Sequence, residues 1–439
     1  MSLPTRARSC LARLAFSIAA VAAVPHVSPA QRAPSIPDSL SDREFWRIFT
    51  SMSEESGRFP SENFVSNERT YQHVIPTLER SLTRNGVYLG VGPEQNFTYI
   101  VNLEPRLAVI FDIRRQNAML HLMYKALFEL SPTRSTFLAR LFSRPSSRAL
   151  ATSASPAELF DAISTAPAGD SAFGATWKAI VDRLTVTHGF ALSSDDIASM
   201  RKVLEAFREA GPDISYAYRL GVPPQVTHWL VTYAQLQSAT NADSVNMSFL
   251  ATEESYRKLR VLETRNLIVP IVGDFAGPKA IRSVGEYLKE RSATVTAFYT
   301  SNVEQYLFNG FGADERFYRN IETLPIDSTS MFIRSLPGSV SIVTTAPLVG
   351  MLSATQFNSV RIIDSSGVRI VLAATVDSSG KEVTTRVGTL PAPAPSSASA
   401  FTSGIAPIRR TLDAFLSGQL KTYQQLTAMT KIDGWQVRP

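Results

Sequence analysis

The pattern of apolar and polar positions predicts strands that alternate with helices up to about residue 340. Short apolar runs with the length of buried parallel strands cover residues 86–92, 107–112, 267–273 and 294–299. Residues 115–130 carry apolar side chains at helical spacing, directly after the second run. Strands that alternate with helices predict an α/β fold with a mostly parallel sheet, which we assign to residues 85–340.

Several segments interrupt or extend this pattern. Roughly residues 133–250 have a helical pattern and contain no apolar run typical of a buried strand, so we predict a large helical insertion. Residues 341–388 contain alternating runs separated by two Asp-Ser-Ser-Gly turns, which predicts a small C-terminal β-meander. The Pro- and Ala-rich residues 389–404 are expected to be a linker, and residues 405–439 a C-terminal helix.

The N-terminus has the pattern of a secretory signal. Three arginines precede an apolar stretch of residues 14–24, and small residues follow it up to Ala30. This predicts a signal peptide, residues 1–30, that is cleaved near Ala30. The apolar stretch is too short to span a bilayer, so we expect an exported, periplasmic or secreted protein without a transmembrane segment in the mature chain. Residues 31–84 would form an N-terminal leader and helices.

Composition narrows the function classes. The formal net charge is +6, and loss of Arg6, Arg8 and Arg13 with the leader would leave +3, so we expect no nucleic-acid partner. Cys10 is the only cysteine and lies within the leader, which leaves no disulfide or thiol chemistry. The four histidines outside the leader lack the spacing of a helical metal site, so no metal is expected.

The most informative stretch is a glycine turn after the first apolar run, Gly90-Val-Gly92-Pro-Glu94-Gln-Asn96. Asp112 ends the next apolar run 20 residues after Gly92, which is typical of a nucleotide-binding βαβ unit. Gln95 stands where dinucleotide-binding loops carry a third glycine, and this disfavours a dinucleotide. We predict a small nucleoside-type ligand, bound by the residues Gly90, Gly92, Glu94, Asn96, Asp112 and Arg114.

Two further polar residues follow predicted strands. Asp274 comes directly after the third run, and Asn302 after the fourth. Ligands of open α/β sheets bind beyond the carboxyl ends of the strands, so both residues are candidates for the site. For Asp112 a second interpretation stays open, because aspartate is also a favoured helix N-cap.

These motifs resemble the first two motifs of S-adenosylmethionine-dependent methyltransferases. The resemblance implies that the glycine loop lies against the methionine part of the cofactor and that Asp112 binds the ribose hydroxyls. Asp274 and Asn302 would then lie near the methyl group as catalytic residues. Together with Gly273-Asp-Phe-Ala-Gly-Pro-Lys279 and Ser301-Asn-Val-Glu-Gln-Tyr306, the motifs also resemble an uncharacterised bacterial domain family with a Rossmann-like, methyltransferase-like fold, over roughly residues 40–340.

Two hypotheses follow from this resemblance. The first is a methyltransferase of unknown substrate that uses S-adenosylmethionine. The signal peptide conflicts with it, because S-adenosylmethionine is made in the cytoplasm. The second is therefore an exported, non-catalytic Rossmann-like protein with a binding or structural role that transfers no methyl groups.

Overall fold

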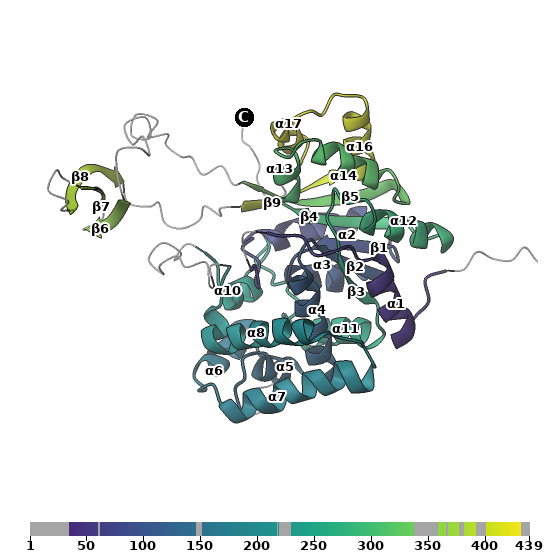
Figure 1. Ribbon diagram of the computed structural model, residues 1–439, viewed down its shortest axis with the longest axis horizontal. Helices are drawn as coiled ribbons and strands as arrows, with labels where there is room; N and C mark the ends of the chain where they lie inside the picture. Colours follow the sequence, from purple (N-terminus) through teal and green to yellow (C-terminus); the bar gives the residue numbers. More distant parts are fainter. Residues whose placement is uncertain are drawn as a thin grey trace, which may run out of the picture.

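The computed structural model describes residues 35–59, 62–145, 152–216, 218, 230–337, 359–365, 368–376, 382–391 and 401–431. Its centre is a six-stranded sheet with the strand order β3-β2-β1-β4-β5-β9 (Figure 1). The strands are β1 Val87–Val91, β2 Leu107–Asp112, β3 Ile268–Val272, β4 Val295–Ser301, β5 Ile326–Pro337 and β9 Phe401–Pro407.

The pairs among β1 to β5 are parallel, and β9 pairs with β5 in the antiparallel direction. Strands β2 and β3 are buried along their whole length, as their continuous apolar sequences require. The prediction of an α/β fold with a mostly parallel sheet is therefore confirmed.

Helices connect the strands and cover the sheet. The helices nearest to the sheet are α1 Asp42–Met52, α2 Ile75–Ser81, α3 Gln95–Leu103, α4 Arg115–Leu130, α12 Ala280–Glu290, α13 Val303–Leu307 and α14 Ala313–Ile321. Helix α1 begins because Ser41 caps it, accepting a hydrogen bond from the Glu44 N–H (3.2 Å). Its buried face carries Phe45, Phe49 and other apolar residues, and it packs on β3.

Between α4 and β3 the described residues are mainly helical. The elements are α5 Arg134–Leu141, α6 Pro156–Ser164, α7 Asp170–Asp182, a π-helical turn η2 Arg183–Thr187, α8 Ser194–Ala210, η3 Gly211–Asp213, α10 Tyr233–Ser238 and α11 Glu253–Thr264. They form a layer below the sheet in Figure 1. An aromatic core joins this layer to α4: the rings of Phe128 and Phe137 stack with centroids 4.7 Å apart.

The chain beyond β5 forms a second, three-stranded antiparallel sheet. Its strands are β6 Ser359–Ser365, β7 Val368–Val376 and β8 Glu382–Pro391, in that order. The predicted linker, residues 389–404, is too long at both ends, because β8 continues to Pro391 and β9 begins at Phe401. Two helices, α16 Ile408–Leu416 and α17 Tyr423–Ala428, follow β9.

Residues 53–59 and 62–70 form a strap across the carboxyl ends of the parallel strands. The Glu54 N–H donates to the last carbonyl of β3 (2.8 Å), and the Gly57 N–H donates to the carbonyl that follows β2 (2.8 Å). Further along, the Glu68 carboxylate reaches the end of β4. The strap therefore covers the edge at which ligands of open α/β sheets bind.

Candidate functional site

The glycine loop and the predicted ribose acid lie at the same level of the sheet. Val91 pairs with Phe111 in the parallel register of β1 and β2, so Gly92 and Asp112 come next on adjacent strands. Gly92 has a φ of +77°, which favours glycine, and a Cβ added there would meet no atom within 4 Å. Gly92 is buried, and its backbone conformation rather than crowding favours glycine at this position.

Gly90 and Asn96 shape the loop. A Cβ at Gly90 would lie 1.9 Å from Asn96 Oδ1, so only glycine allows this close approach. The Asn96 amide donates to the carbonyls of Val91 (2.9 Å), Gly92 (3.2 Å) and Pro93 (2.7 Å), and its Oδ1 accepts from the Tyr88 hydroxyl (2.9 Å). These bonds use the hydrogen-bonding capacity of Asn96 within the loop itself.

The Gly92 carbonyl is also held by helix α4. It accepts hydrogen bonds from Asn117 Nδ2 (3.1 Å) and His121 Nε2 (2.8 Å). Burial lowers the pKa of His121 to about 4, so the ring is neutral at pH 7 and Nδ1 keeps a lone pair. Within the described residues, neither Asn117 Oδ1 nor His121 Nδ1 has a hydrogen-bond partner. Two buried acceptors close to Gly92 thus keep unused lone pairs.

Glu94, the acidic residue of the glycine loop, has a strongly shifted pKa. Its side chain is fully buried, and burial raises the pKa of Glu94 to about 8. Oε1 accepts a long hydrogen bond from the Ser66 N–H of the strap (3.4 Å), and among the described residues Oε2 has no partner. A buried carboxyl group without a cation beside it is a candidate functional group.

Asp112 and Arg114 neutralise each other. Asp112 Oδ1 accepts from the backbone N–H (2.8 Å) and Nε (2.9 Å) of Arg114, and Oδ2 lies 2.8 Å from Arg114 Nη2. Both side chains are buried, and Arg114 also donates to the carbonyl of Glu62 in the strap. The carboxylate therefore anchors the turn before α4 and retains lone pairs for one further donor.

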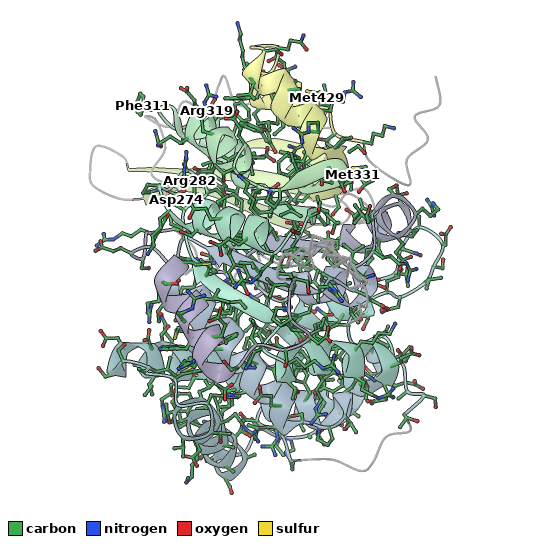
Figure 2. The ribbon with its side chains drawn as sticks, turned by 90° about the vertical axis from the view of Figure 1, so that its right-hand side faces the viewer. Asp274, Arg282, Phe311, Arg319, Met331 and Met429 are labelled. Atoms are coloured by element: carbon green, nitrogen blue, oxygen red, sulfur yellow. The ribbon has the colours of Figure 1, made fainter. Side chains whose placement is uncertain are left out.

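A groove of about 730 Å³ opens at the carboxyl ends of β2 and β3; Ile113 lines it, and the buried Asp112 before it does not. This volume is in the usual range for small-molecule sites. Asp274 lies in the groove, is partly exposed and reaches the molecular surface in Figure 2. The groove is lined by Thr50, Ser53, Glu54, Glu55, Gly57, Ile113, Arg115, Asp274, Gly277, Pro278 and Lys279.

Glu54 of the strap closes the inner end of this groove. Its carboxylate accepts from the backbone N–H groups of Asp274 (3.1 Å), Lys279 (2.8 Å) and Ala280 (2.7 Å). It thus occupies the N-terminus of α12, where a ligand anion would otherwise be favoured. The groove therefore presents side chains rather than free backbone donors to a ligand.

The structure does not bring Asp274 and Asn302 together. Asp274 follows β3 and Asn302 follows β4, and β2 and β1 lie between these strands. Neighbouring strands are about 4.8 Å apart, which separates the two strand ends by roughly 14 Å. One methyl group could not lie next to both residues, so their predicted pairing as catalytic residues is not supported by the geometry.

The strap fills the space between β1 and β4 with Glu68, a residue that the sequence did not mark. Its carboxylate accepts from Gln95 Nε2 (2.8 Å), the Tyr299 hydroxyl (2.7 Å) and Ser301 Oγ (2.6 Å). Burial raises the pKa of Glu68, and Ser301 has an uncommon φ of +50°. The strand order reverses at this position, which is where ligands of such sheets bind.

Glu304 of α13 and Arg334 of β5 form a buried structural ion pair. Arg334 Nε lies 2.6 Å from Glu304 Oε2, and Nη2 lies 3.0 Å from Oε1. The Tyr318 hydroxyl donates to the same carboxylate (2.6 Å), and both charged side chains are buried. This pair joins α13 and α14 to β5.

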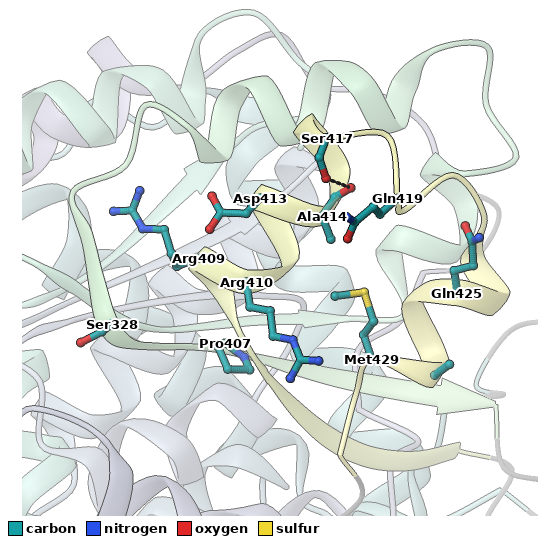
Figure 3. Close-up of a pocket in the computed structure, with 11 residues that line it drawn as sticks. Ser328, Pro407, Arg409, Arg410, Asp413, Ala414, Ser417, Gln419, Gln425 and Met429 are labelled. Atoms are coloured by element: carbon teal, nitrogen blue, oxygen red, sulfur yellow. Dashed lines mark hydrogen bonds between the residues drawn. The ribbon is translucent and has the colours of Figure 1, made fainter.

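A second groove, of about 840 Å³, lies between α16 and α17 beside Ser328, near the start of β5 (Figure 3). Arg409, Arg410 and Asp413 come from α16, and Gln425 comes from α17. Because β5 begins here, this groove lies away from the carboxyl edge that holds the predicted site residues.

A family model, the domain of unknown function DUF7790, matches residues 63–360, which is more than half of the chain. The chain belongs to this family. The match to DUF7790 begins inside the strap, spans the glycine loop and β1 to β5, and ends within β6. Glu54 and strand β9 lie outside it. No curated protein matches the chain.

The described residues of this DUF7790 protein show neither a membrane-spanning helix nor a metal site. Within them, no helix combines the length and apolar character needed to cross a membrane. Among the same residues, no group of three or more His, Cys, Asp and Glu side chains is arranged to hold a metal ion.

Proposed function

We propose that the chain is an S-adenosylmethionine-dependent methyltransferase-like protein with a Rossmann-like sheet. The order of β1 to β5 follows the doubly wound pattern of nucleotide-binding sheets, and doubly wound sheets often carry an antiparallel edge strand, as β9 is here. The placement of Gly92 and Asp112 side by side on adjacent strands is the observation that carries this proposal. Ile113, the residue after Asp112, lines an open groove at the same edge of the sheet.

The residues around the groove fit a nucleoside. Ile113 provides an apolar wall for a base, and the Asp274 carboxylate is an acceptor for its amino group. Asp112 keeps lone pairs for a ribose hydroxyl, and the space at Gly92 would take the remainder of the ligand. S-adenosylmethionine would supply an electrophilic methyl group, and the protein would hold it in line with an acceptor.

A second candidate is an exported Rossmann-like binding protein that transfers no methyl groups. Glu68 and its partners Gln95, Tyr299 and Ser301 occupy the space between β1 and β4, where an acceptor substrate would lie. This observation favours binding without transfer. The sequence pattern of residues 1–30 adds to it, and the mass of the N-terminus in native cells would test cleavage near Ala30.

Calorimetric titration with S-adenosylmethionine and S-adenosylhomocysteine tests the proposal. We expect micromolar binding, which corresponds to about 8 kcal/mol. Asp112→Asn should weaken binding at least tenfold, because a carboxylate acceptor for the ribose is lost. Asp413→Asn is the matched control, since this exposed acid lines the other groove. A folded protein that binds neither compound would reject the nucleoside site and favour a different ligand.

A further inference from the structure

A partly buried imidazole ties helix α1 to helix α4. His188 Nδ1 lies 2.7 Å from Asp42 Oδ1 at the start of α1, and Nε2 lies 2.8 Å from Glu129 Oε2 near the end of α4. Carboxylate oxygens only accept hydrogen bonds, so both ring nitrogens must carry hydrogen. The ring is then a charged imidazolium between two carboxylates. We call Asp42, Glu129 and His188 the clamp.

The backbone around His188 is unusual. The π-helical turn η2 Arg183–Thr187 precedes it, and the His188 N–H donates to the Arg183 carbonyl (3.0 Å). Gly189, with a φ of +67°, then reverses the chain, so that the Phe190 ring stacks on the imidazole at 5.0 Å. Short π-helical segments are rare and concentrate at functional sites. The turn places the imidazole between α1 and α4.

The Glu129 side of the clamp has other cations. Lys125 Nζ lies 2.8 Å from Glu129 Oε1, and Arg183 Nη1 lies 3.8 Å from Oε2. Glu263 of α11 also faces Lys125, and burial raises the pKa of Glu263 to about 8. Glu129 therefore stays paired when His188 loses its charge.

On the Asp42 side, the described residues place no second cation within ion-pair distance of the carboxylate. Besides His188, Asp42 Oδ1 accepts from Asn266 Nδ2 (2.9 Å), which is a neutral donor. A neutral imidazole has a single N–H and can serve only one of the two carboxylates. Deprotonation of His188 would thus weaken the attachment of α1 rather than that of α4.

Helix α1 connects the clamp to the groove. Asp42 is its first residue, and Thr50, Ser53, Glu54 and Glu55 at its other end line the groove. The helix lies along β3, the edge strand beside that groove (Figure 1). A change in how the start of α1 is held therefore acts on one wall of the groove.

We propose that the clamp is a pH-sensitive lock: protonated His188 fixes α1 and the groove wall, and loss of its proton releases α1 so that the groove opens. Burial alone lowers the pKa of His188, but the hydrogen bonds to Glu129 and Asp42 outweigh it and raise this pKa above 6.5. The stabilisation is complete below pH 6.5 and is lost as the pH rises through the raised pKa. The lock goes beyond the proposed function, because it requires no particular ligand.

Hydrogen exchange of the full chain, followed by mass spectrometry between pH 5.5 and 9 and corrected for intrinsic rates, tests the lock. We expect protection of α1 to fall about tenfold, relative to β1, for each unit by which the pKa of His188 is raised. His188→Gln should remove this pH dependence. His73→Gln, a half-buried histidine of the 3₁₀ turn η1 Tyr71–Val74, is the control and should retain it.

Three results would overturn the lock. These are protection of α1 that does not depend on pH, an unchanged pH step in His188→Gln, and an NMR titration that places the pKa of His188 at or below 6.5. If His188→Gln does not fold, Asp42→Asn answers the same question, and its α1 should exchange rapidly at every pH. None of these measurements uses S-adenosylmethionine, so they are independent of the ligand experiments.

Discussion

The ion pair between Glu304 and Arg334 allows a stringent test of which charges near the strand ends are structural. Both side chains are about 1% exposed, and the two N–O distances are 2.6 and 3.0 Å. Glu304→Gln removes the negative charge and leaves the guanidinium buried without a counter-ion. Breaking one half of a buried pair costs about 3–5 kcal/mol, so we expect a loss of that size in the free energy of unfolding.

Urea denaturation followed by circular dichroism and tryptophan fluorescence would measure this loss, and coincident curves would establish a single transition. Glu322→Gln is the matched control, because Glu322 pairs with Arg319 at 3.3 Å where both side chains are about half exposed. We expect it to cost at most about 0.5 kcal/mol. The reasoning is refuted if Glu304→Gln costs less than about 1 kcal/mol. A loss of ligand affinity without a loss of stability would instead place Glu304 in the binding site.

Two further predictions concern the glycine loop. Gly90→Ala should destabilise the protein by about 1–3 kcal/mol, because its Cβ would overlap Asn96 Oδ1. In Gly92→Ala the added Cβ meets open space, so the variant costs only the strain of a positive φ, roughly 1 kcal/mol. Thermal melts compare the two variants, and equal losses of stability would contradict this account. Burial raises the pKa of Glu94 from 4.5 to about 8, so the folded state binds this proton more tightly and stability should fall as the pH rises from about 4.5 to 8. Glu94→Gln should abolish that fall and be more stable than the parent at pH 8, and urea midpoints that shift equally with pH in both proteins would argue against it.

The central strands could be read from the sequence because burial on both faces leaves a continuous apolar run. The run that ends in Asp112 gives β2 with the same bounds, Leu107–Asp112. Strand β9 could not be read in this way. It is an antiparallel edge strand with Thr402, Ser403 and Gly404 in its sequence, and its pairing with β5 crosses a long stretch of chain. Composition alone suggested a linker there.

The glycine loop and Asp112 could be located from the sequence because their spacing is local. The strap could not be located from the sequence, because Glu68 forms its hydrogen bonds with residues 95, 299 and 301, which are far away in the chain. A glutamate in a polar loop carries no local signal of burial. The same holds for His188: its spacing excluded a helical metal site, but its contacts with Asp42 and Glu129 depend on how the helices pack.

The pairing of β5 with β9 has a consequence for how this chain can be divided. Pro337 faces Phe401 in the register, so β9 rejoins the main sheet opposite the last residue of β5. Facing residues of antiparallel strands have Cα atoms about 5 Å apart, a gap that a short turn can close. A fragment cut at residue 360 would expose the edge of β5, whereas a short turn in place of residues 338–400 would keep β5 paired with β9. We therefore expect residues 35–337, joined by such a turn to residues 401–431, to fold without the second sheet.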